Sequence, residues 1–178
     1  DCHLGAGDHS MPGAHWPEQV RRAVEVRAES IGTDRGALQV VIAVSNVGAG
    51  HHFPTTATPL ATLSVEQMVA GNPQPGTFRL WTIGRTVQFS AGRWQEVEDS
   101  RIPAGETRTY QYSLPSAAGV DAISVRLHFF PDWHYAGLLP RLAARAGTSN
   151  MARERLERAA RQAELSGTEV RHLVLPLD

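Results

Sequence analysis

Short apolar runs separated by turn-forming residues recur from residue 18 to residue 130. Residues 18–31, which alternate from Ala23 onward, predict a strand with one face in solvent. Residues 38–47 are almost continuously apolar, which suits a strand buried on both faces or one that carries the sheet into the loop that follows. Similar runs predict strands at residues 59–69, 78–89, 94–97, 107–114 and 120–130. The pattern favours an antiparallel Ig-like β-sandwich over residues 18–130, with a hairpin across Gly32 to Gly36.

The end of the chain, residues 131–178, follows a different pattern. Residues 138–146 predict a short helix in which Pro140 is suited only to the first turn. Ser149 or Asn150 can cap a second helix that stops near Gly167, and its Arg- and Glu-rich face is expected to be solvated. Residues 168–177 alternate again and predict a strand that returns to the sheet. We therefore expect a helical appendage with a final strand after the sandwich domain.

Composition and charge exclude several classes of function. The formal net charge is −1, and Arg and Glu are intermixed, so the chain lacks a basic stripe for a nucleic-acid backbone. No apolar run is long enough to cross a bilayer, and the first residues lack the basic and apolar parts of a signal peptide. Cys2 is the only cysteine, so no disulfide can form within the chain. We expect a soluble chain with no nucleic-acid partner and no membrane span.

The stretch from Asn46 to Thr56 nominates a functional site. Gly48 and Gly50 allow unusual backbone conformations or close approach of another group, and Pro54 stiffens the chain after the two histidines. Such a loop presents His51 or His52 in a defined direction. A neutral imidazole can bind haem iron, zinc or copper, or act as an acid or base. The loop therefore predicts a histidine site without specifying its chemistry.

Residues 1–17 form an irregular segment that is rich in potential ligands, because it combines three histidines with Gly and Pro. The haem c attachment signal is C-x-x-C-H, in which two thiols bond the porphyrin and the histidine ligates the iron. Cys2 and His3 match the last two positions of that signal, and His9 lies in a Gly-Asp-His-Ser-Met-Pro-Gly turn. The segment therefore suggests haem binding.

The order of these motifs resembles the carboxy-terminal region of multihaem c-type cytochromes of the cytochrome c554-like kind. The shared features are the Cys-His pair, the Gly-Asp-His turn, a Pro-Glu-x-x-Arg-Arg-Ala segment, and a strand leading into Ala-Gly-His-His-Phe-Pro-Thr. Residues 99–106, the run Phe-Pro-Asp-Trp-His-Tyr at 130–135, and the helical tail resemble the same proteins. The resemblance covers nearly the whole chain, but the first cysteine of the haem signal is absent from it.

This resemblance implies that the protein transfers electrons through haem c. It implies that Cys2 anchors a haem, that His3 is a proximal iron ligand, and that His9 and His51 are distal iron ligands. The expected partners are other haem-bearing segments or subunits of a cytochrome assembly, together with a redox partner protein. Because haem c is attached outside the cytoplasmic membrane, the resemblance also implies a periplasmic, extracellular or cell-surface location.

Two other classes of function remain open. The chain could be a non-catalytic β-sandwich whose histidine loop docks on a neighbour, or a protein that binds copper or zinc through a histidine cluster. An enzyme is not expected, because Gly-x-Ser-x-Gly, His-Glu-x-x-His and phosphate-loop motifs are absent from the sequence. His15 and His52 are weaker ligand candidates, whereas His128, His134 and His172 are expected to be partly buried histidines with ordinary hydrogen-bonding roles.

Overall fold

A computed structural model describes residues 13–34, 37–145 and 147–177 of the chain. Two antiparallel sheets form its centre, one with the strand order β1-β2-β7 and the other with the order β6-β5-β3-β8-β9, to which β4 adds a short pairing with β3. The elements are α1 (Pro17–Ala23), β1 (Val24–Asp34), β2 (Ala37–Asn46), β3 (Leu60–Val69), β4 (Asn72–Pro73), β5 (Arg79–Ser90), β6 (Arg93–Asp99), β7 (Thr107–Pro115), β8 (Ala122–Phe130), α2 (Trp133–Ala143), α3 (Asn150–Glu164) and β9 (Thr168–Pro176). The predicted mainly antiparallel β fold with helices near its end is confirmed.

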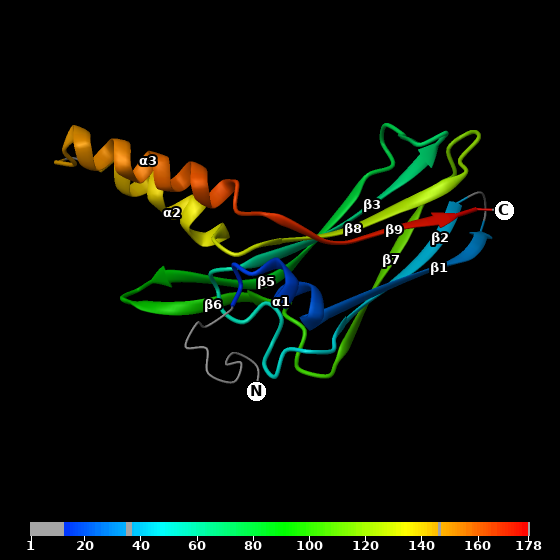
Figure 1. The fold of residues 1–178 in the computed structure, drawn as a ribbon, viewed down its shortest axis with the longest axis horizontal. Coiled ribbons are helices and arrows are strands. Elements are labelled where there is room, and N and C mark those ends of the chain that lie inside the picture. The colour runs from blue at the N-terminus through cyan, green and yellow to red at the C-terminus, as the bar shows by residue number, and fades with distance from the viewer. Residues whose placement is uncertain (1–12, 35–36, 146, 178) are drawn as a thin grey trace.

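The core lies between the two sheets, and both contribute side chains to it. In Figure 1, β3, β8 and β9 lie above β1, β2 and β7 in the right-hand half of the molecule. Alternate residues of each strand face inward, because successive side chains of a strand point to opposite faces. Ile42 and Tyr112 from one sheet and Leu63 and Leu127 from the other are fully buried. The sheets are therefore held together by apolar packing between their inner faces.

Two expectations about the first strands need correction. Residues 17–23 form helix α1 rather than the start of a strand, since Pro17 occupies the first helical turn and the charges of Glu18 and Arg22 complement the helix dipole. The continuous apolar run of β2 is buried on one face only: its burial alternates strictly, and Val41 is half-buried where Ile42 is buried. The alternative, that β2 carries the sheet into the histidine loop, is confirmed, as is the β1–β2 hairpin.

The helices α2 and α3 form a hairpin between the paired strands β8 and β9, and it extends to the left in Figure 1, above β5 and β6. Ser149 caps α3 by accepting a hydrogen bond from the backbone N–H of Ala152 at 3.3 Å, as predicted. The prediction for α2 was wrong, because the helix begins at Trp133 and contains Pro140 in its interior. Pro140 is exposed, so water can reach the backbone carbonyl that the proline leaves without a helical partner.

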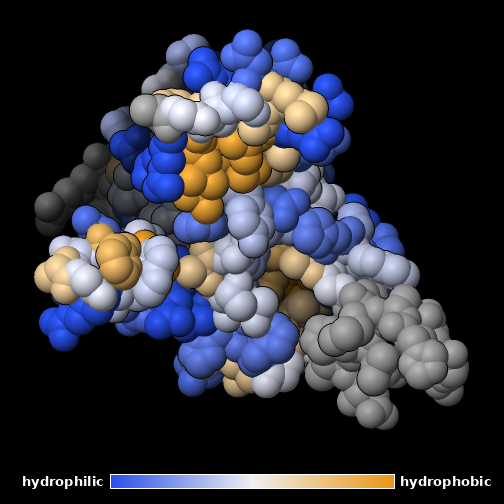
Figure 2. Space-filling view, turned by 90° about the vertical axis from the view of Figure 1, so that its left-hand side faces the viewer, coloured by the Kyte–Doolittle hydropathy of each residue, from blue (hydrophilic) through white to orange (hydrophobic). Residues whose placement is uncertain are grey.

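The two helices pack through small residues. Ala143 of α2 faces α3, where Ala160 and Ala163 are buried. Figure 2 shows apolar surface on the helical hairpin between hydrophilic flanks. None of the described helices is long and apolar enough to cross a membrane.

Candidate functional site

The histidine loop, residues 47–59, begins at a buried amide. Asn46 is fully buried, although it ends a strand of apolar inward-facing residues. Its Nδ2 donates to the carbonyl oxygens of His51 at 2.7 Å and Ile102 at 3.1 Å, and its Oδ1 accepts from the backbone N–H of Ala49 at 3.1 Å. The Asn46 side chain thus bonds three backbone groups around the turn that precedes His52, and its own polar atoms are satisfied although it is buried.

A short bridge to a remote segment fixes the other side of the histidines. Phe53 and Ile102 exchange two backbone hydrogen bonds of 2.8 Å each. Both side chains are buried, and the Phe53 ring lies 5.7 Å from the ring of Phe129 in β8. The Phe53–Pro54 peptide bond is cis. His51 and His52 therefore sit between two fixed points, Asn46 and Phe53.

Position 48 requires glycine because another segment of backbone lies very close to it, not because of its backbone angles. The N–H groups of Val47 and Gly48 both donate to the carbonyl oxygen of Ala23, at 2.9 and 3.1 Å. A Cβ at Gly48 would overlap the carbonyl oxygen of Arg22. The glycine thus lets the loop lie directly against the junction of α1 and β1, which is the role expected of glycine where two backbones meet.

An ion pair ties the far end of the loop to the end of β6. Arg101 donates from Nη2 to Asp99 at 2.6 Å and from Nη1 to the carbonyl oxygen of Thr55 at 2.7 Å. The hydrogen bond from the Arg101 guanidinium lowers the pKa of Asp99 to about 2, with smaller contributions from the backbone N–H of Arg101 and from His52. Asp99 is therefore ionised at any physiological pH, and its ion pair with Arg101 is present throughout that pH range.

The His51 ring has a defined tautomer. Its Nδ1 lies 2.9 Å from the carbonyl oxygen of His52. A carbonyl oxygen can only accept, so Nδ1 donates, and in the neutral imidazole the lone pair is then on Nε2. A metal-ligating histidine commonly donates its other nitrogen in this way, because the hydrogen bond fixes the ring orientation and raises the basicity of the ligand. His51 is an exposed residue.

The structure describes only part of the predicted ligand set. Cys2, His3 and His9 lie outside the described residues, so their predicted roles stay predictions. His15 is described, and its Nε2 pairs with the carboxylate of Asp132 at 2.9 Å. Within the described ranges, no three His, Cys, Asp or Glu side chains gather in a way that could hold a metal ion.

Of the three histidines that were expected to be partly buried, His128 and His134 are half-buried, whereas His172 is exposed. His172 lies 3.2 Å from the hydroxyl of Ser124, and His128 lies 3.9 Å from Glu169. His134 lines a groove between β5 and α2. Sequence reasoning also missed Asn46, Asp99 and Arg101 as residues that hold the loop; an amide at the end of an otherwise apolar strand was the one available signal.

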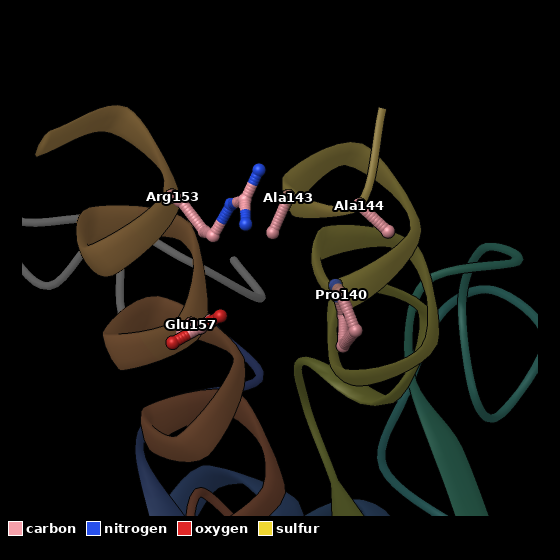
Figure 3. Close-up of a pocket in the computed structure, with 5 residues that line it drawn as sticks. All are labelled: Pro140, Ala143, Ala144, Arg153 and Glu157. Carbon is pink, nitrogen blue, oxygen red and sulfur yellow. The ribbon is translucent and has the colours of Figure 1, made fainter. Parts of the chain in front are cut away.

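A second hollow lies between the two helices, near the loop that joins them. It has a volume of about 200 Å³ and is lined by Pro140, Ala143 and Ala144 of α2 and its C-terminal cap and by Arg153 and Glu157 of α3 (Figure 3). Alanine and proline leave space there because their side chains are short. None of the residues that line this hollow belongs to the histidine loop, so the two are separate.

Comparisons with known proteins place the fold. No protein-family model and no curated protein matches the chain. A crystal structure of a penta-heme cytochrome c552 from Thermochromatium tepidum matches with a TM-score of 0.67 and 18% identity, over 96% of this chain and 43% of that chain. A GH20 exo beta-N-acetylglucosaminidase from Vibrio harveyi reaches a TM-score of only 0.29, at 8% identity over 58% of this chain and 16% of that chain.

The first of these matches concerns almost the whole of this chain but less than half of the cytochrome. At this level of identity it reports on fold, and it supports the fold-level part of the resemblance found in the sequence. The chain therefore has a multihaem cytochrome-like fold, built from two antiparallel sheets and a helical hairpin.

Proposed function

We propose that this chain is part of a multihaem c-type cytochrome of the c554-like kind and takes part in electron transfer, with His51 as a ligand of haem iron. The observation that carries the proposal is the hydrogen bond from Nδ1 of His51 to the carbonyl oxygen of His52 at 2.9 Å. It leaves the lone pair on Nε2, which is the nitrogen that a haem iron ligand offers. The likeness to a penta-heme cytochrome supports the assignment at the level of fold.

The residues around His51 fit a ligand whose position must not change. Asn46 holds the His51 carbonyl, and the Phe53–Ile102 bridge holds the chain two residues later, so the imidazole starts from a backbone fixed on both sides. Haem c, when bound, supplies the one-electron chemistry of its iron. The role of the chain is to hold Nε2 in one direction and to limit rearrangement when the charge on the iron changes.

The remaining parts of the proposal concern residues and partners beyond this loop. We propose that Cys2 anchors a haem, with His3 as proximal and His9 as distal iron ligand, and that the chain acts as an electron carrier rather than as an enzyme. Its partners would be other haem-bearing segments or subunits and a redox protein. Because haem c is attached outside the cytoplasmic membrane, the proposed location is the periplasm or the cell surface.

Replacing His51 tests the proposal. In the haem-containing assembly, His51→Ala should open a coordination position and convert part of a low-spin spectrum to a high-spin or ligand-binding one. His52→Ala is the matched control: it replaces the next residue and keeps the backbone carbonyl that holds the His51 ring, so the spectrum should change little. The measurement is the absorption and electron paramagnetic resonance spectrum of each variant, with and without added cyanide.

An unaltered low-spin spectrum in His51→Ala would contradict the ligand role and favour the alternative, a β-sandwich that docks on a neighbour. One observation already points toward docking. The β5–β6 hairpin exposes the rings of Phe89 and Trp94, whose centroids lie 5.5 Å apart, together with Val97. Exposed apolar side chains that gather in this way are typical of interaction surfaces.

A further inference from the structure

A groove of about 320 Å³ lies between β5, α2 and the end of the histidine loop. Arg85 and Val87 of β5 form one wall, Trp133, His134 and Arg141 of α2 form the other, and Ala57 of the histidine loop closes one side. In Figure 1, α2 lies above β5 and β6 on the same side of the molecule. The volume falls within the range of small-ligand sites.

The groove is cationic. Arg85 and Arg141 enter it from different elements, and no acidic residue is among the described residues that line it. Arg85 has a partner, because its Nε donates to Glu96 at 2.7 Å, although its outer nitrogens take no part in that bond. Arg141 makes no side-chain hydrogen bond or ion pair with any described residue. Its place in the last turn of α2 suits the helix dipole, but that role does not require the side chain to line a groove.

The groove also has an aromatic wall. The Trp133 side chain is 49% exposed although it contacts Phe130, whose ring centroid lies 5.6 Å away. The indole is therefore held by β8 on one side and open on another. Leu138 and Val87 add apolar surface beside it. Guanidinium groups bind carboxylates in a planar, two-pronged arrangement, and an indole face packs on flat rings.

We propose that this groove binds a carboxylate carried on a flat apolar ring, with Arg141 and Arg85 at the carboxylate and Trp133 against the ring. Two sources have this chemistry: the propionate edge of a haem and a free aromatic carboxylate. The haem source rests on the proposed function, whereas the site itself does not. Because Ala57 belongs to the loop that carries His51, a ligand in the groove also touches the segment that presents the imidazole.

The experiment titrates the full chain with metal-free protoporphyrin IX and follows the porphyrin absorption band. Without a metal, the porphyrin offers nothing to the lone pair of His51, so the result is independent of the iron-ligand assignment. The dimethyl ester of the same porphyrin lacks both carboxylates and is the matched probe. We expect the free acid to bind about tenfold or more tightly than the ester, and Arg141→Gln to weaken binding of the acid by about tenfold.

Two variants control for charge and folding. Arg145→Gln removes an exposed arginine that lies just past the end of α2 and does not line the groove, and it should leave binding unchanged. Arg141→Lys keeps the charge without the planar fork and should lose an intermediate amount. Equal binding of acid and ester, equal losses in Arg141→Gln and Arg145→Gln, or no binding of the acid would each overturn the proposal.

A third probe, 2-naphthoate, distinguishes the two sources. Binding of 2-naphthoate that depends on Arg141 and matches that of the porphyrin assigns the groove to free aromatic carboxylates. Porphyrin binding that depends on Arg141, with naphthoate binding at least tenfold weaker, assigns it to a haem edge. Either result supports a carboxylate site, and neither depends on the spectrum of His51→Ala.

Discussion

The buried amide of Asn46 offers the sharpest test of how the fold holds the histidine loop. Asn46→Ala removes three hydrogen bonds at once: two donated by Nδ2, to His51 and Ile102, and one accepted by Oδ1 from Ala49. Each bond contributes about 1 kcal/mol net, and the Ile102 carbonyl keeps its second bond, from the N–H of Phe53. We therefore expect the free energy of unfolding to fall by about 3 kcal/mol.

Urea unfolding followed by circular dichroism measures this loss. For a chain of this size, about 3 kcal/mol corresponds to a decrease of about 6–12 °C in the melting temperature, and the dependence of stability on urea should be unchanged. The matched control is Asn72→Ala. Asn72 is exposed and makes one side-chain hydrogen bond, to the carbonyl oxygen of Ala70, so its loss should cost less than about 0.5 kcal/mol. If the two variants lose the same stability, Asn46 does not hold the loop.

Two further predictions concern the contacts on either side of the loop. Gly48→Ala should destabilise the chain by about 1–3 kcal/mol, because the added Cβ would meet the backbone at Arg22. Gly137 of α2 has open space around it, so the control Gly137→Ala should stabilise the chain by about 0.5–1 kcal/mol. If thermal unfolding ranks the two variants in the opposite order, the close-approach argument is wrong. The pKa of Asp99 is lowered from 3.8 to about 2, so its ion pair stabilises the fold fully above about pH 4 and is lost as the pH falls through 2. In urea unfolding across this range, wild type should be more stable than Asp99→Asn by about 1 kcal/mol near neutrality, after allowance for solvent screening, and this difference should be mostly lost at pH 2. A constant difference would refute the assignment.

The strands could be predicted from the sequence because each one carries its own evidence. Alternation in residues 107–114 and 168–177 reports directly on a sheet with one buried face, and both became strands. The failures occurred where two patterns compete. Pro17 opens a helical turn in front of an alternating stretch, so the helix takes the residues before Val24. In β2, Val41 and Ala43 are as apolar as Val40, Ile42 and Val44. Which face is buried depends on the second sheet, which covers one face of β2 only.

The candidate site was predictable only in its local part. Gly48, Pro54 and the paired histidines mark a constrained loop in the sequence, and the structure has one there. The residues that constrain it from outside, Ile102 and Arg101, follow β6 and lie about fifty positions later. Their approach depends on how β5 and β6 pair and on where β7 begins beside β2, which no short-range pattern encodes. The tautomer of His51 likewise depends on the direction of one carbonyl group, which is a property of the folded loop.

The Asn46 side chain holds the histidine loop by its backbone groups. Its effect on stability can therefore be measured apart from the proposed ligand role of the His51 ring. Its bonds go to the carbonyl of His51 and the N–H of Ala49, not to the His51 ring. The stability losses of Asn46→Ala and His51→Ala should therefore add within about 0.5 kcal/mol in the double variant. Their spectral effects should not add, because displacing the loop cannot change the coordination of the iron further once the imidazole has been removed. A strong coupling in stability would instead mean that the ring holds the loop, and His51 would then be present for structure rather than for iron.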